Sequence, residues 1–151
     1  MPLLALLLAC AALVAGCGDE GPERPIDLDA YAAALSALRE SEGDGQLHAA
    51  RVDGSEITFD LVREGPATRV RWTGDELETT GDDVVAGPYF DLAELTAEGA
   101  QALVDAAPVA VERIDFTPVE DLRATVTVIG GGRTFTAALD GSGLRELEPV
   151  G

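Results

Sequence analysis

The chain has 151 residues, and its 28 Asp and Glu outnumber 10 basic residues, giving a formal net charge of −18. All ten basic residues are arginine, and hydrophobic residues make up 46% of the chain, which is typical of a globular protein. Nucleic-acid binding is largely excluded, because contacts to phosphates need a basic surface. The length fits one domain, or two small repeats that share one core.

The chain opens with an apolar segment. Residues 2–16 contain no charged side chain, and the sequence becomes abruptly polar after Cys17. This run is shorter than the about 20 residues of a membrane-spanning helix and fits the core of a secretory signal peptide. We therefore expect residues 1–16 to be a cleaved signal peptide. The alternatives are an uncleaved membrane anchor and an ordinary secretory signal with two incidental cysteines.

The end of this segment reads Leu-Val-Ala-Gly-Cys, from Leu13 to Cys17, and resembles the lipobox of bacterial lipoproteins. The resemblance implies cleavage after Gly16 and a diacylglyceryl group, with its palmitate-type acyl chains, on Cys17. The mature protein would then be anchored by lipid to the cell membrane or envelope, outside the cytoplasm. Residues 17–26 would form a polar tether. Cys10 is a poorer candidate, because cleavage there leaves too short an apolar core.

The remaining residues, 27–151, show signs of an internal duplication. Identical residues recur at a spacing of 67 residues. The first such pair is Leu28 and Leu95, and the last is Leu77 and Leu144. The order of predicted elements recurs with the same spacing. We therefore predict one α+β domain built from two tandem units, residues 27–83 and 91–148.

Each predicted unit begins with a helix. Asp29 and Thr96 are equivalent under the shift, and both residue types are good helix N-caps. An apolar stripe at helical spacing follows each cap, ending at Gly43 in the first unit and Pro108 in the second. The stripes consist of Tyr31, Leu35 and Leu38, and of Ala100, Leu103, Val104 and Ala107.

Alternating apolar and polar residues predict antiparallel strands after each helix. In chain order these strands cover residues 46–52, 57–63, 68–73, 76–80, 109–117, 123–129, 134–139 and 144–148. A four-residue turn at 64–67 would place Phe59 opposite Trp72 on the inner face and Asp60 opposite Arg71 on the outer face. The two helices would cover the inner face of the sheet.

This order of elements resembles the tandem architecture of the β-lactamase-inhibitor-protein and PepSY-like group. That group consists of secreted or envelope-facing binding modules, so the resemblance implies a binding function. The resemblance rests on the order of elements across most of the mature chain. It includes no sequence motif, so it assigns no functional residue in this chain. A second comparison is with lipoproteins that carry lipids in a half-barrel cavity.

Few residues suggest catalysis. His48 is the only histidine, and no serine lies in a Gly-x-Ser-x-Gly elbow, so a general base has no evident nucleophile. The run 130–132, three glycines, is better suited to a hairpin turn than to a phosphate loop. The carboxylates at 75–83 could bind calcium weakly, but an acidic edge strand explains them equally well. We expect no cofactor and no metal site.

One surface remains as a candidate for binding. Arg69 and Arg71 share the outward side of their strand, and Thr125 and Thr127 decorate the equivalent side in the second unit. The alternative is an ordinary solvated sheet face. We therefore expect a tethered, non-catalytic domain that binds an envelope protein or a small ligand. A hydrolase or lyase using His48, and a lipid carrier with an apolar cavity, are the alternatives.

Overall fold

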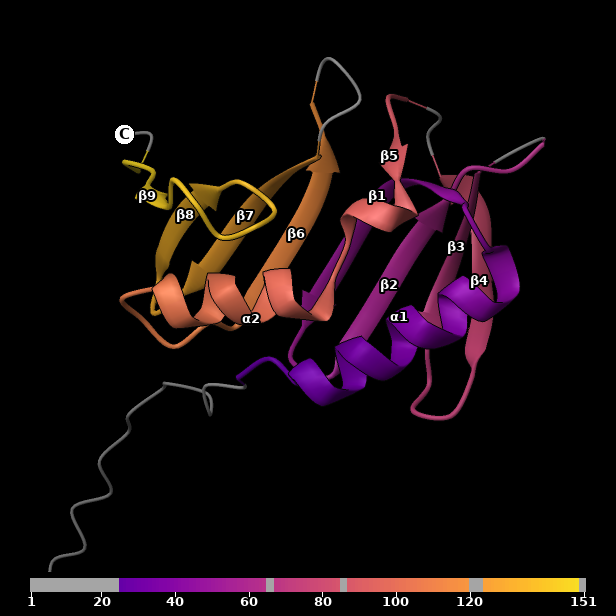
Figure 1. Ribbon diagram of the computed structural model, residues 1–151, viewed down its shortest axis with the longest axis horizontal. Coiled ribbons are helices and arrows are strands. Elements are labelled where there is room, and N and C mark those ends of the chain that lie inside the picture. Colours follow the sequence, from indigo (N-terminus) through magenta and orange to yellow (C-terminus); the bar gives the residue numbers. More distant parts are fainter. Residues whose placement is uncertain (1–24, 65–66, 85–86, 120–123, 150–151) are drawn as a thin grey trace, which may run out of the picture.

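The computed structural model describes residues 25–64, 67–84, 87–119 and 124–149, and Figure 1 shows their arrangement. The first half contains α1 (Leu28–Glu42), β1 (Gln46–Asp53), β2 (Glu56–Leu61), β3 (Ala67–Trp72) and β4 (Leu77–Val84). The second half contains β5 (Phe90–Asp91), a 3-10 turn η1 (Leu92–Glu94), α2 (Ala97–Ala106), β6 (Arg113–Pro118), β7 (Ala124–Gly130), β8 (Arg133–Ala137) and β9 (Arg145–Glu146). The predicted signal peptide, Cys10, Cys17 and most of the predicted tether lie outside the described residues.

The strands form one nine-stranded sheet in the order β4-β3-β2-β1-β6-β7-β8-β9, and its strand pairs are antiparallel. β1 and β6 are the central strands, and β5 pairs with the start of β1. Both helices lie on the same face of this sheet, α1 over the strands of the first half and α2 over those of the second (Figure 1). The predicted α+β class is therefore confirmed. Within the described part of the chain, neither helix is long and apolar enough to cross a membrane.

Two backbone hydrogen bonds fix where α1 begins. Ile26 donates its N–H to the carbonyl of Val111, and Asp27 donates to that of Gly54, which holds Asp27 in an extended conformation against the sheet. The side chain of Asp27 then accepts the N–H of Ala30 at 2.9 Å. Asp27, and not the predicted Asp29, is therefore the N-cap.

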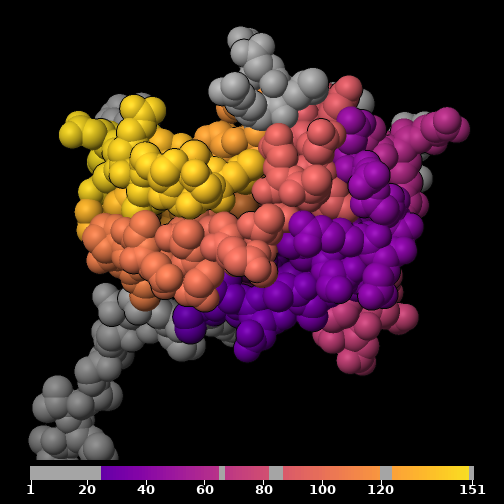
Figure 2. Space-filling model, viewed as in Figure 1, coloured from indigo at the N-terminus to yellow at the C-terminus, as the bar shows by residue number. Residues whose placement is uncertain are grey.

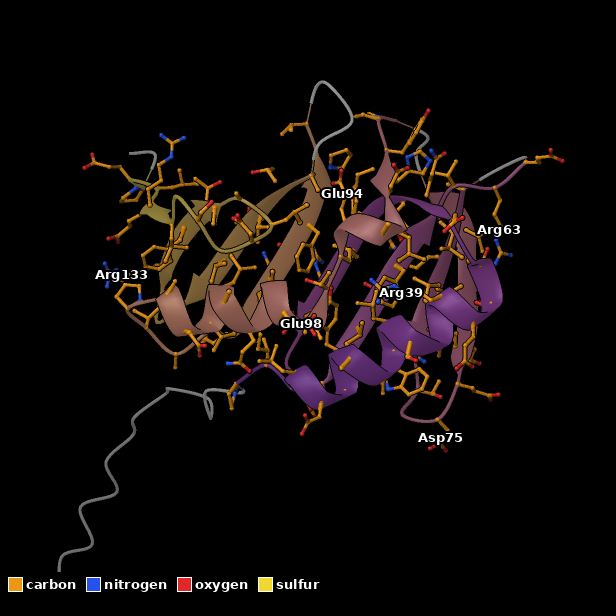
Figure 3. All side chains as sticks on the ribbon, viewed as in Figure 1. Arg39, Arg63, Asp75, Glu94, Glu98 and Arg133 are labelled. Carbon is orange, nitrogen blue, oxygen red and sulfur yellow. The ribbon has the colours of Figure 1, made fainter. Side chains whose placement is uncertain are left out.

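The second helix begins where the sequence predicts. The hydroxyl of Thr96 accepts the N–H of Gly99 at 2.9 Å and so caps α2. The two helices are also joined directly, because the guanidinium of Arg39 donates to the carbonyl of Leu95 just before α2. Figure 3 shows Arg39 pointing from α1 toward this segment.

The core lies between the helices and the central strands. Tyr31 of α1 stacks on Phe116 of β6, with ring centroids 6.1 Å apart and planes 9° from parallel, and both rings are buried. The predicted stripe residues Leu35, Leu38 and Leu103 are buried in the same core. Among the described residues the Tyr31 hydroxyl has no hydrogen-bond partner, and burial raises the pKa of this phenol well above its usual value.

The predicted pairing of β2 with β3 has the correct inner and outer faces but the wrong register. Phe59 lies opposite Val70 and not Trp72, and Asp60 lies opposite Arg69 and not Arg71. The connection between the strands is longer than the predicted four residues, because β2 ends at Leu61 and β3 begins at Ala67. Because the shift is two residues, every side chain keeps its predicted face.

The β7–β8 hairpin has the predicted glycine turn, and its register repeats that of β2–β3. Gly131 and Gly132 form a two-residue turn, and their φ angles of 56° and 71° are those that favour glycine. Val126 lies opposite Ala137, the register that follows from moving the observed Phe59–Val70 pair by 67 residues. The glycine run is therefore a hairpin turn between strands, as predicted.

Candidate functional site: the outer face of the sheet

The outer face is the side of the sheet opposite the helices. Cross-strand neighbours on this face form one continuous line of polar residues from β4 to β9, which we call the polar row. Its members, in spatial order, are Glu78, Arg71, Thr58, Arg51, Asp115, Thr127, Thr136 and Arg145. Neighbouring positions along the same strands, such as Phe59, Ile114 and Val128, are buried against the helices. Strand alternation thus separates an apolar inner face from a polar outer face.

Two arginines hold one carboxylate at the middle of the polar row. The Nε of Arg51 lies 2.5 Å from Oδ1 of Asp115, and the Nε of Arg113 lies 3.1 Å from Oδ2. The Asp115 side chain is 14% exposed, whereas that of Arg51 is 54% exposed. The carboxylate is therefore fixed between β1 and β6, while the Arg51 guanidinium keeps donors that face solvent.

A second ion pair lies beside this centre. Arg69 donates from Nε and Nη2 to the two oxygens of Asp60, at 2.6 and 2.9 Å. Hydrogen bonding to Asp60 raises the pKa of the Arg69 guanidinium above its usual value. Asp60 is 8% exposed and is the one charged residue among the buried described residues, so it depends on this partner.

Arg71 has a different partner from the one predicted. Its Nη2 lies 3.6 Å from Oε2 of Glu78 on β4, and both side chains are about half exposed. A pair this exposed contributes little to stability. Arg71 therefore has one long ion pair with an exposed partner, whereas Arg69 makes two hydrogen bonds to a buried carboxylate.

A hollow of about 350 Å³ lies in the outer face between these ion pairs. Its floor includes Ala49 and Ala50, and its walls include Arg51, Asp60, Arg69, Asp115 and Thr127. Ala49, which lies opposite Asp60, has a small side chain and leaves space where the neighbouring strands carry longer ones. The hollow can therefore accept a small polar group, with guanidinium donors and threonine hydroxyls within its walls.

The structure brings some of the predicted binding residues together and separates others. Arg69 and Thr127 line the hollow. Arg71 lies toward β4, and the Thr125 hydroxyl lies 3.5 Å from that of Thr136. Sequence reasoning missed Arg51 and Asp115, although both lie on predicted strands. The missing information was that these two strands are neighbours at the centre of the sheet.

The outer face differs in charge from the rest of the protein. Five of the ten arginines in the sequence, Arg51, Arg69, Arg71, Arg113 and Arg145, occupy outer-face positions on the strands, whereas Arg133 of β8 occupies an inner-face position. The carboxylates of Asp60, Glu78 and Asp115 each pair with one or two of them. The face thus carries paired charges of both signs, on a chain whose net charge is −18.

The other candidate residues gain little support from their surroundings. His48 lies on β1, and its Nδ1 is 3.0 Å from the carbonyl of Pro88, a backbone partner that orients the ring without activating a nucleophile. Asp75 lies in the turn between β3 and β4, and Glu78 lies on β4. Among the described residues no three potential ligands are grouped closely enough to hold a metal ion.

No family model, curated protein or solved structure matches the chain.

Proposed function

We propose that this chain is a cell-envelope lipoprotein, anchored by lipid on Cys17 and carrying a binding domain at 27–151. The lipobox resemblance supports the anchor. The domain begins at Asp27, directly after the proposed tether of residues 17–26, and Ile26 is already bonded to Val111, in the segment that leads into β6. Replacing Cys17 with serine should abolish metabolic labelling by a fatty-acid analogue and block cleavage, whereas replacing Cys10 should change neither. Lipid labelling that persists without Cys17 would refute the anchor.

We also infer that the domain consists of two tandem units of the same plan. In support, α1 is followed by β1 to β4 and α2 by β6 to β9, and the two sets run outward from the central pair β1–β6. The register of β2–β3 recurs in β7–β8 with a spacing of 67 residues. Two such units placed side by side form one wide sheet. Both helices lie on the same face of this sheet, so its other face is uncovered (Figure 1).

The domain acts by contact, and the outer face of the sheet is its binding surface. The observation that carries this proposal is the hollow between Arg51, Arg69 and Thr127, on a face that neither helix covers. Arginine is enriched at binding hot spots, and partly exposed guanidinium groups offer directional donors to a carboxylate or carbonyl. A partner that presents a carbonyl-rich loop to this face fits it best, because the carboxylates of Glu56, Asp60 and Asp115 also line the hollow and would repel an acidic loop.

Capture from detergent-solubilised membranes tests the proposal, with the lipidated full chain as bait. Arg69→Ala combined with Arg71→Ala should weaken capture of any partner found with the wild type. The matched control combines Arg63→Ala with Arg133→Ala, which also removes two paired arginines but leaves the lining of the hollow intact. Full capture by the double variant would refute the assignment of this face. No observation favours the hydrolase or the lipid carrier as a second candidate.

A further inference from the structure

A groove runs along the flank of the domain, between the C-terminal half of α1 and the edge strand β4. Its volume is about 480 Å³. The floor is apolar and includes Leu38, Leu61, Val70 and Leu77, while Ala37 forms part of the helical wall. In Figure 2 the indigo surface of α1 meets the magenta surface of the β3–β4 segment along this flank. The groove belongs to the helical side of the sheet and is separate from the hollow on the outer face.

The rim of the groove is acidic. Glu40 and Glu42 line it from α1, and Asp75 and Glu76 line it from the turn between β3 and β4. The one basic lining residue, Arg63, is already paired with Glu42 at 2.5 Å. Figure 3 shows Arg63 beside the last turn of α1 and Asp75 at the tip of the β3–β4 turn. An apolar floor with an acidic rim fits a lysine or arginine side chain. Its aliphatic stem can lie on the floor while its charged end pairs with the carboxylates of the rim.

The strand beside the groove has an unpaired edge. β4 pairs with β3 on one side, and among the described residues no strand pairs with its other side. The irregular part of its pairing lies near Gly81, so the segment from Leu77 to Thr79, which lines the groove, keeps a regular register. An exposed regular edge can add a strand from another chain through backbone hydrogen bonds.

We propose that the β4 edge and this groove together bind an extended basic segment of a partner protein. The segment adds as a strand to β4 and places a lysine or arginine side chain in the groove, over Leu77. Charge complementarity selects this occupant. A second copy of the chain is disfavoured, since it would bring an equally acidic β4, with Glu78, Asp82 and Asp83 in its sequence, against the first. This site is independent of the proposed outer-face function.

Fluorescence of Trp72 provides the measurement. It is the only tryptophan in the chain, and it lies directly opposite Leu77 across the β3–β4 pair. The full chain, in a non-ionic detergent, is titrated with an eight-residue peptide of alternating arginine and valine. We expect a saturable change in Trp72 emission. A peptide of alternating glutamate and valine should produce none, and equal binding of both peptides would overturn the proposal.

Two methylated forms of the basic peptide test strand addition itself. One carries N-methyl groups on every valine and the other on every arginine, and the two have the same charge. In a strand, alternate N–H groups point to opposite edges, so only one set can bond to β4. We expect one form to bind at least about tenfold more weakly than the other. Equal binding of the two forms would show attraction of cations without strand addition, and would overturn the proposal.

A pair of variants tests the groove. Ala37→Arg places the chain's own guanidinium in the groove, and should weaken binding of the arginine–valine peptide at least about tenfold. Ala33→Arg is the control, because Ala33 is exposed on the same helix, does not line the groove and gives the same change in charge. Its binding should match the wild type. Unchanged binding by a folded Ala37→Arg chain would overturn the assignment of the groove.

Discussion

The pair formed by Asp60 and Arg69 should stabilise the domain as a coupled unit. Three variants form a double-mutant cycle: Asp60→Ala, Arg69→Ala and the combination of the two. Removal of Arg69 alone leaves a carboxylate that is 8% exposed without its two hydrogen bonds. Removal of both partners eliminates that unpaired charge. The double variant should therefore lose less stability than the sum of the two single variants.

The size of the coupling follows from the exposure of the two partners. Exposed ion pairs contribute about 0.2–1 kcal/mol, and hydrogen bonds to charged groups in protected positions contribute about 1.5–3 kcal/mol. Here the Asp60 side chain is 11% exposed and that of Arg69 is 51% exposed, so solvent screens one partner only. We expect a coupling free energy of about 1–2 kcal/mol, between the two limits.

Urea unfolding followed by the fluorescence of Trp72 gives the free energy of unfolding for each variant. Each 1 kcal/mol corresponds to a shift of about 4 °C in Tm for a domain of this size, so thermal unfolding supplies an independent check. A coupling below about 0.3 kcal/mol would refute the reasoning. Arg69 would then be a freely solvated side chain, and its fixed position beside the hollow would lose its physical basis.

Three further predictions concern the core and the turns. Trp72→Ala should cost about 1.5–3 kcal/mol, less than a fully buried aromatic, because Trp72 is only partly buried; a loss above about 4 kcal/mol in urea unfolding would contradict this. Tyr31→Phe should leave the free energy of unfolding unchanged or raise it by about 1 kcal/mol at pH 7, because it removes a buried hydroxyl without a described partner; clear destabilisation would show that the hydroxyl is bonded. Because burial raises the pKa of Tyr31, the unfolded state ionises first above about pH 10, and wild-type stability should fall there more steeply than that of Tyr31→Phe. Gly130→Ala would place a Cβ 2.0 Å from the carbonyl oxygen of Ala110 and should cost about 2–3 kcal/mol or prevent folding; wild-type stability would contradict that contact.

Local patterns predicted most of the elements of the fold. Alternation of apolar and polar residues located the strands, and helical spacing located Leu35 and Leu38 on the buried side of α1. Thr96 was recognisable as an N-cap because its hydroxyl acts on a residue three positions away. These interactions join residues that are only a few positions apart, so a local sequence pattern is enough to predict them.

Long-range contacts explain the errors. Asp29 and Asp27 are equally good caps in isolation, and bonds from Ile26 and Asp27 to distant residues decided between them. The partner of Asp60 depended on the length of a turn, which strand alternation does not determine. The same limit applied to the candidate site, because Arg51 and Asp115 meet only when β1 and β6 pair across 64 residues.

Site-specific photocrosslinking in living cells tests the proposed contact between the outer face of the sheet and a partner in the envelope. A photoreactive amino acid is placed at Thr127, beside the hollow, or at Gln101, which is exposed on α2. We expect a discrete crosslinked product from Thr127 and none from Gln101. A product from Gln101 alone would exclude the outer face and assign the contact to the helical face.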